Sequence, residues 1–201
     1  MTMEIKIPDF ALVLLIGPSG SGKTHFARRF FTGAEIMSQE QFQEMLSDDG
    51  SDEALHEEAL KLMYQAIELR LKYKKSCVVE AELLTQESRK EFRRLFRKYH
   101  AKAISIVFIA DAQICLARNM AKLGSDAKSQ LVRSQIGRMA RIPKELEEEG
   151  FKTRYFVGPE IDDLQVLRTK MRSDFRQELG PFDIVGDVHG CFDELLMLLQ
   201  E

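Results

Sequence analysis

Eight residues near the start of the sequence have the composition and spacing of a phosphate-binding loop. They fit the pattern GxxxxGK[ST] and are Gly17, Pro18, Ser19, Gly20, Ser21, Gly22, Lys23 and Thr24. The glycines allow successive backbone N–H groups to turn towards one anion, and the positive end of a following helix would lie beneath it. We therefore expect Lys23 to reach the β- and γ-phosphates of ATP or GTP and Thr24 to bind Mg²⁺.

The elements on either side of this loop agree with that interpretation. A continuous apolar run, residues 12–16, precedes the loop and predicts a strand that is buried on both faces. A helical pattern at residues 25–31 follows. The agreement of eight residues with both flanking elements favours a phosphate-binding loop over an incidental glycine-rich turn.

Short apolar segments alternate with helical patterns along the rest of the chain. We predict further strands at residues 35–38, 77–81, 104–110 and 154–157, and helices at residues 54–74, 85–100 and 127–141. In the second of these helices, Phe92, Leu95, Phe96 and Tyr99 fall on one face behind a Thr85 cap. The pattern predicts an α/β, three-layer fold of the P-loop NTPase type, with a mostly parallel sheet and its ligand at the carboxyl ends of the strands.

The last forty residues predict a domain boundary. A helix expected at residues 161–179 ends at Gly180-Pro181, and a strand at residues 182–185 leads into the motif Gly-Asp-Val-His-Gly at residues 186–190. An apolar helix is expected at residues 192–201. We interpret residues 1–179 as one P-loop domain and residues 180–201 as the incomplete start of another.

The order of these motifs resembles that of the bacterial polynucleotide kinase-phosphatases, in which a P-loop kinase module precedes a calcineurin-like phosphoesterase module. The resemblance covers essentially the whole chain. The residues that carry it are the P-loop, the segment at residues 77–81, the Arg118-Asn119 pair, residues 149–151 and residues 182–191. It implies a kinase that uses ATP and Mg²⁺ to phosphorylate the 5′-OH end of RNA or DNA, as part of a longer end-repair protein that continues beyond residue 201.

The resemblance also implies which residues serve the acceptor. Family members have a Ser-x-Asp-x-x-Arg pattern after the second strand, and residues 38–43 read Ser-Gln-Glu-Gln-Phe-Gln here. Glu40 keeps a carboxylate that can accept the proton of the attacking hydroxyl. Gln43 replaces the arginine that grips the acceptor phosphate, and a neutral amide is a weaker phosphate ligand than a guanidinium. The alternative for Glu40 is an exposed residue in the first turn of a helix.

A lid over the transferring phosphate is expected between residues 111 and 126. The resemblance assigns Arg118 to stabilising the charge on the phosphoryl oxygens. One helical turn later, Lys122 stands where a second arginine is expected, and Ser125 stands at a position that is often basic in the family, so the lid has fewer arginines here. Glu80 resembles the acidic residue that supports Mg²⁺ through water. Arg118 could instead belong to a solvated helix face, and Glu80 could cap a helix or pair with a lysine.

Within the second motif, Asp187 and His189 match two ligands of the dinuclear centre of calcineurin-like phosphoesterases, which holds Mn²⁺, Ni²⁺ or similar ions. The other ligands belong to motifs that the 201 residues do not include. We therefore expect no phosphatase activity from this chain.

Charge and cysteine content restrict the partners and the compartment. A net charge of −3 argues against a long electrostatic footprint on duplex nucleic acid, although a strand end remains possible. Six cations at residues 89–98 could follow a single strand or simply form a solvated helix face. Cys77, Cys115 and Cys191 lack metal or disulfide spacing and predict reduced thiols in the cytoplasm. No signal peptide or apolar stretch long enough for a membrane span is visible.

Two other functions remain open at this point. Gln43 and the thinned lid favour a degenerate P-loop module that binds nucleotide and regulates or docks its neighbours, whereas Lys23, Thr24 and Arg118 favour an enzyme. A small-molecule kinase of the shikimate or gluconate type is the third possibility. The motif at residues 186–190 argues against it, because a phosphatase partner suits an end-processing kinase.

Overall fold

The computed structural model describes residues 3–47, 53–123, 126–159, 161–171, 179–180 and 189–199. The side chains of Glu53, residues 120–129 and Asp162 lie outside this description. The chain divides into two units, Met1–Met171 and Arg172–Glu201, and each is considered by itself.

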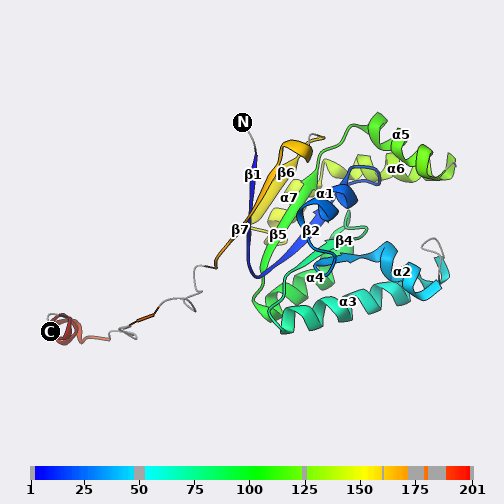
Figure 1. The fold of residues 1–201 in the computed structure, drawn as a ribbon. Coiled ribbons are helices and arrows are strands. Elements are labelled where there is room, and N and C mark those ends of the chain that lie inside the picture. Colours follow the sequence, from blue (N-terminus) through cyan, green and yellow to red (C-terminus); the bar gives the residue numbers. More distant parts are fainter. Residues whose placement is uncertain are drawn as a thin grey trace. The chain divides into compact units, whose positions relative to one another are not determined.

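A parallel sheet forms the centre of the first unit (Figure 1). Its five strands lie in the order β3-β4-β2-β5-β6, and all neighbours are parallel. Their bounds are Ala11–Ile16 for β2, Ile36–Ser38 for β3, Cys77–Glu80 for β4, Lys102–Phe108 for β5 and Thr153–Val157 for β6. These strands confirm the five predicted from apolar runs. All six residues of β2 are buried because the strand is central and covered on both faces.

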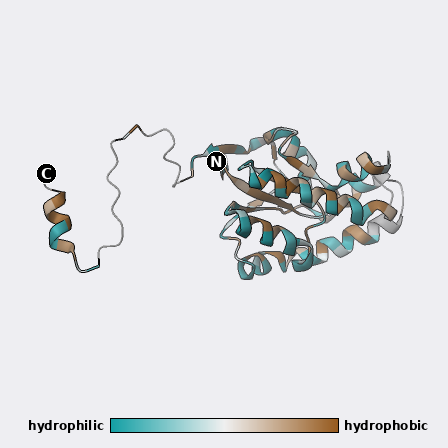
Figure 2. Cartoon of the chain, turned by 90° about the horizontal axis from the view of Figure 1, so that it is seen from below, coloured by the Kyte–Doolittle hydropathy of each residue, from teal (hydrophilic) through white to brown (hydrophobic). Residues whose placement is uncertain are grey.

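Seven α-helices of this unit are described. They are α1 (Lys23–Phe30), α2 (Gln39–Ser47), α3 (His56–Lys72), α4 (Gln86–Tyr99), α5 (Ala112–Leu123), α6 (Asp126–Met139) and α7 (Ile142–Glu148). Short 3-10 turns, η1 (Glu53–Leu55) and η2 (Ile161–Asp163), complete the set. Buried residues of α3, α4 and α7 pack against one face of β2 in one apolar cluster. Figure 2 shows apolar and polar residues sharing these helices, as expected for elements that cover a sheet.

Helix α4 illustrates how local sequence sets an element. Thr85 caps it by accepting a hydrogen bond from the Ser88 N–H at 3.1 Å, and the Ser88 hydroxyl returns a bond to the cap backbone. Phe92 and Leu95 are buried in the cluster on the α3 and α4 face. The predicted cap and apolar face are both confirmed.

The opposite face of the sheet is covered differently from the prediction. Helix α1 covers part of it, and a second, two-stranded parallel sheet covers more. This sheet pairs β1 (Glu4–Pro8) with β7 (Gln165–Thr169). The helix expected at residues 161–179 is therefore wrong at residues 165–169. Leu164 and Val166 pack against the same apolar cluster as Ile5 and Ile7. Alternate residues of this segment therefore face the core, as in a strand, and the segment does not form a helix. Residues 172–178 and the strand expected at 182–185 lie outside the described residues.

Most of the cations at residues 89–98 contact carboxylates or carbonyls of the same chain. Arg89 is fully buried and donates to Glu149, to Glu145 at 2.7 Å and to the Leu83 carbonyl at 2.8 Å. Arg93 lies 3.7 Å from the carboxylate of Glu149. These contacts join α4 to α7 and to the loop after β4. Arg89 therefore does not belong to a solvated face or to a nucleic-acid track.

Replacing Arg89 with methionine should destabilise the fold by about 3 kcal/mol or more, because Glu149 would keep a buried charge without its partner. Urea unfolding monitored by circular dichroism measures this loss. Lys90→Met is the matched control, since Lys90 is 68% exposed and pairs only with exposed Glu87 among the described residues. A control that loses as much stability as Arg89→Met would refute the role of the buried pair.

In the second unit, the description covers residues 179–180 and 189–199. Helix α8 spans Phe192–Leu198, which confirms most of the helix expected there. None of its residues is buried. In the described parts of both units, no helix combines the length and the apolar character needed to cross a membrane.

Candidate functional site

The loop between β2 and α1 has the backbone of a phosphate cradle. Gly20 and Gly22 have φ values of 79° and 101°, a region in which residues with a side chain are strained. The Ser21 N–H donates to the Pro18 carbonyl at 3.2 Å, which closes the turn. Helix α1 then begins at Lys23, so its N-terminus faces the loop. The geometry follows from glycines at the two positions that require a positive φ.

The Lys23 side chain folds back over this loop. Its Nζ donates to the carbonyls of Gly17 at 2.8 Å and Pro18 at 2.9 Å. Burial lowers the pKa of the Lys23 ammonium, and the nearby Glu80 carboxylate opposes that shift. Lys23 also lines an open pocket of about 870 Å³. Its ammonium is therefore held at the loop by weak neutral acceptors that an anionic phosphate can replace.

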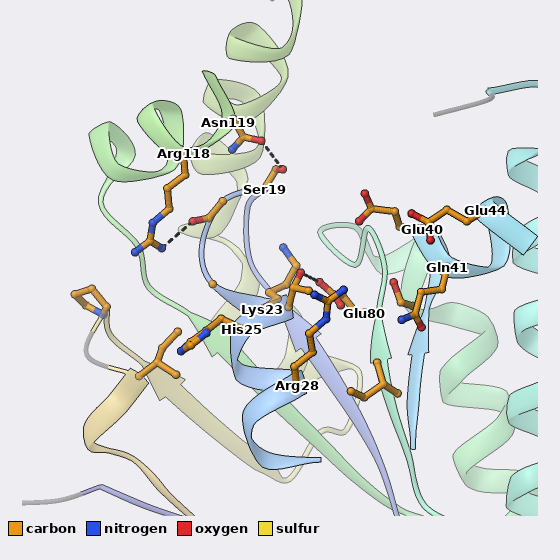
Figure 3. A pocket seen from close by; sticks show the side chains of 17 residues that line it. Ser19, Lys23, His25, Arg28, Glu40, Gln41, Glu44, Glu80, Arg118 and Asn119 are labelled. Atoms are coloured by element: carbon orange, nitrogen blue, oxygen red, sulfur yellow. Dashed lines mark hydrogen bonds between the residues drawn. The ribbon is translucent and has the colours of Figure 1, made fainter. Parts of the chain in front are cut away.

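Thr24 and Glu80 both line this pocket, and Figure 3 shows Glu80 beside Lys23. The Thr24 hydroxyl donates to a carboxylate oxygen of Glu80 in a short hydrogen bond. One residue starts α1 and the other ends β4, which is the neighbour of β2. A hydroxyl and a carboxylate are oxygen donors suited to Mg²⁺, and phosphate oxygens and water complete such sites. The two residues fit a magnesium ion bound together with a nucleotide.

Helix α2 brings a carboxylate to the other side of the pocket. It begins directly after β3, so Glu40 lies in its first turn at the carboxyl end of the sheet. Glu40, Gln41 and Glu44 line the pocket and are exposed. Figure 3 shows Glu40 across from Lys23. Gln43 is 8% exposed and is absent from the lining, because this position of α2 turns inward.

The lid predicted at residues 111–126 begins with α5, which contacts the loop. Arg118 donates to the Gly20 carbonyl at 3.1 Å. The adjacent Asn119 accepts from the Ser19 hydroxyl at 2.8 Å and donates to the Cys115 carbonyl at 2.7 Å. A Cβ on Gly20 would lie 2.6 Å from Asn119, so the close approach of α5 also depends on glycine. Lys122 is on α5, but its side chain lies outside the described residues.

Helix α6 also contacts the loop, through a residue that the sequence did not single out. The Ser19 N–H donates to the Gln135 Oε1 at 2.8 Å. Gln135 is on α6, is 8% exposed and lies 116 positions from Ser19 in the sequence. A polar residue in a mixed helix gives no local signal for such a contact. Helices α5 and α6 therefore both hold Ser19, α5 through its hydroxyl and α6 through its backbone N–H.

Gln135→Ala should loosen this end of the loop, because the Ser19 N–H would lose its acceptor. We expect hydrogen exchange at the Ser19 amide to become at least about tenfold faster, consistent with the roughly 1–3 kcal/mol cost of an unsatisfied donor. Amide exchange with mass spectrometry checks this result. Gln130→Ala, at an exposed position of the same helix, is the control. Equal exchange at Ser19 in both variants would contradict the role of Gln135.

The described residues do not test whether the two expected ligands of a second metal centre lie together. Asp187 lies outside the described residues, and His189 is exposed before α8. Among the described residues, no group of three or more His, Cys, Asp or Glu side chains could hold a metal. The pairing of Asp187 and His189 stays a prediction.

Comparisons with known proteins place the chain in a family and give its fold. The sequence matches the AAA_33 family, described as an AAA domain, over residues 12–146. No curated protein matches the chain significantly. Among solved structures, a chain of the Pnkp1/Rnl/Hen1 RNA repair complex is similar with a TM-score of 0.57 and 19% identity, over 68% of this chain and 46% of that one. The present chain thus spans less than half of that relative's length.

Two further solved structures are similar to this chain. A chain of the PezAT chromosomal toxin-antitoxin system of Streptococcus pneumoniae has a TM-score of 0.59 and 16% identity, over 96% of this chain and 84% of that one. Shikimate kinase from Acinetobacter baumannii has a TM-score of 0.47 and 18% identity, over 74% and 83% of the two chains. At such identities, structural similarity indicates the fold alone. The match over residues 12–146, which include the phosphate loop, shows that the chain belongs to the AAA_33 family of AAA domains and has a P-loop kinase-like fold.

Proposed function

We propose that this chain is a polynucleotide 5′-hydroxyl kinase that transfers the γ-phosphate of ATP to the 5′-OH end of RNA or DNA. One observation carries the proposal: a single pocket of about 870 Å³ has the phosphate loop on one side and the Glu40 carboxylate on the other. A phosphate donor and a hydroxyl acceptor can meet in such a space. Phosphoryl transfer needs mainly positioning and charge stabilisation, which these groups supply.

Each lining residue has a role in this reaction. The loop N–H groups and Lys23 bind the β- and γ-phosphates, and Thr24 with Glu80 holds Mg²⁺. Glu40 accepts the proton of the 5′-OH while the oxygen attacks the γ-phosphorus and ADP leaves. Arg118, once released from the Gly20 carbonyl, stabilises the charge on the transferring group, and Lys122 assists it. Bound Mg²⁺ supplies further neutralisation of phosphate charge.

The choice of acceptor rests on the resemblance to polynucleotide kinase-phosphatases and is consistent with the fold shared with the RNA repair complex. Under this proposal, residues 1–179 are the kinase domain. Residues 180–201 begin a phosphoesterase module, in which Asp187 and His189 are metal ligands for Mn²⁺ or a similar ion once the module is complete. We also propose that the protein acts in the cytoplasm, where ATP is present and the free thiols of its described cysteines stay reduced.

A nucleotide-binding module without transfer is the second candidate. The buried, neutral Gln43 favours it, because α2 then presents no cation to anchor an acceptor phosphate. Binding and transfer measurements on the same sample separate the two candidates.

The test is transfer of labelled γ-phosphate from ATP·Mg²⁺ to a 5′-OH oligonucleotide. A 5′-phosphorylated oligonucleotide is the control and should receive no label. Shikimate and gluconate serve as small-molecule acceptors. Label on these compounds, without label on any 5′-OH end, would overturn the proposal in favour of a small-molecule kinase. Tight ATP binding with no transfer to any acceptor would favour the non-catalytic module.

A further inference from the structure

Arg28 brings a positive charge into the acceptor side of the pocket. It lies on α1 four residues after Thr24, so both side chains project from the same face of the helix. Arg28 is exposed and lines the pocket together with Glu40, Gln41 and Thr24. In the view of Figure 3, it extends from α1 towards Glu80, between Lys23 and Gln41, whereas Arg118 lies on the opposite side of Lys23. No motif in the sequence distinguishes Arg28 from its neighbour Arg29.

Arg28 also differs from the other pocket cations in its contacts. Lys23 donates to two loop carbonyls and Arg118 to a third. For Arg28, the described part of the chain provides no hydrogen bond, ion pair or ring contact, although three glutamates line the same pocket. A solvated guanidinium loses little by staying unpaired, and its fork of donors matches a phosphate. Its charge is therefore available to an anion that enters the pocket.

The proposed reaction requires a cation at this place. Lys23 and Arg118 belong to the donor phosphates, and Glu40 belongs to the attacking hydroxyl. A 5′-terminal nucleotide also carries a phosphate on its 3′ oxygen, a few bonds from that hydroxyl. Without a cation nearby, the carboxylates of Glu40 and Glu44 would repel this phosphate. Gln43 is neutral and turned inward, so it cannot offset that repulsion.

We propose that Arg28 binds the first internucleotide phosphate of the acceptor strand and thereby selects 5′-OH ends that carry a 3′-phosphate group over free nucleosides. This inference rests on the proposed kinase function and names the acceptor anchor of the same site. Arg28 contacts substrate but takes no part in proton transfer. Its contribution is to acceptor binding, so it should appear in KM for the acceptor.

The test compares two acceptors that differ by one phosphate. For wild type and Arg28→Ala, kinetics are measured with a nucleoside 3′-monophosphate and with the same nucleoside lacking the phosphate. We expect Arg28→Ala to raise KM for the phosphorylated acceptor about 10- to 100-fold, as for the loss of a hydrogen bond between charged groups. KM for ATP, and the kinetics with the free nucleoside, should stay the same. Arg28→Lys should recover part of the loss, because it restores the charge without the fork.

Arg29→Ala is the matched control, since Arg29 is the next residue on α1, lies 5.5 Å from the Phe30 ring and does not line the pocket. Thermal unfolding verifies that all variants fold. An unchanged KM for the phosphorylated acceptor in Arg28→Ala would overturn the inference while leaving the kinase proposal intact. Equal losses with both acceptors, or a raised KM for ATP, would also overturn it. A wild-type chain that neither binds nor phosphorylates any 5′-OH acceptor would defeat the kinase proposal itself, and the inference with it.

Discussion

Lys23→Ala is expected to reduce phosphoryl transfer roughly 10³-fold or more, because the ammonium stabilises charge on the β- and γ-phosphates as the bond to ADP breaks. In the structure, its hydrogen bonds are made to the carbonyls of Gly17 and Pro18. Lys23 itself lines an open pocket, so water can enter the space that its side chain leaves. The variant should therefore keep its fold and lose nucleotide binding or turnover. Transfer of labelled γ-phosphate and titration with ATP measure the two effects separately.

Lys61→Ala provides the control for charge. Lys61 is 66% exposed and pairs with Glu58 one turn away on α3, so its removal should change neither transfer nor stability appreciably. Unaltered transfer by Lys23→Ala would disprove the assigned mechanism. A large loss of stability in that variant would instead show that the lysine supports the loop rather than the phosphates.

The sequence predicts the phosphate loop and the central sheet well because both depend on local patterns. Two glycines with positive φ, an apolar strand before them and a helix after them are all contained in residues 11–30. The five strands of the main sheet are recognisable because a parallel sheet covered on both faces requires continuous apolar runs. The family match over residues 12–146 agrees with that prediction.

Features that depend on contacts between residues far apart in the sequence leave no local pattern and cannot be predicted from it. Strands β1 and β7 are separated by most of the chain, and β7 is largely exposed, so its weak pattern resembles a helix. The bond from Ser19 to Gln135 and the buried pairing of Arg89 with Glu149 join residues from different elements. A charged residue in a helical sequence does not reveal whether its partner is solvent or a buried carboxylate. From the sequence alone, Arg89 is a candidate for contacting a nucleic-acid strand, and its burial beside Glu149 shows that it has a structural role instead.

The proposed acceptor site is derived partly from the sequence and partly from the structure. The resemblance predicts a carboxylate at Glu40, and the first turn of α2 presents this side chain to the pocket. The same helix turns Gln43 inward, and the last turn of α1 brings Arg28 to the pocket instead. We therefore propose that Glu40 of α2 accepts the proton and that Arg28 of α1 binds the acceptor phosphate.

Glu40→Gln should lower the rate of transfer about 10²- to 10⁴-fold while the fold and the affinity for ATP are retained. The carboxamide has nearly the same size as the carboxylate but cannot take up the proton of the 5′-OH. The substituted side chain is exposed, so the change should have little effect on stability. Glu40→Asp should keep much of the activity, because it retains the carboxylate on a shorter arm. Single-turnover measurements with bound ATP separate this chemical step from binding.

Glu44→Gln is the matched control for Glu40→Gln. Glu44 lies one turn later on α2, is exposed and lines the same pocket, so its replacement removes an equal charge from the same space. If Glu40 acts through its proton affinity, the two variants must differ greatly in rate. If Glu40 acts only through its negative charge, both variants should show small and similar effects, and acceptor binding should improve because repulsion of the strand is reduced. The second outcome would assign the proton to water rather than to Glu40.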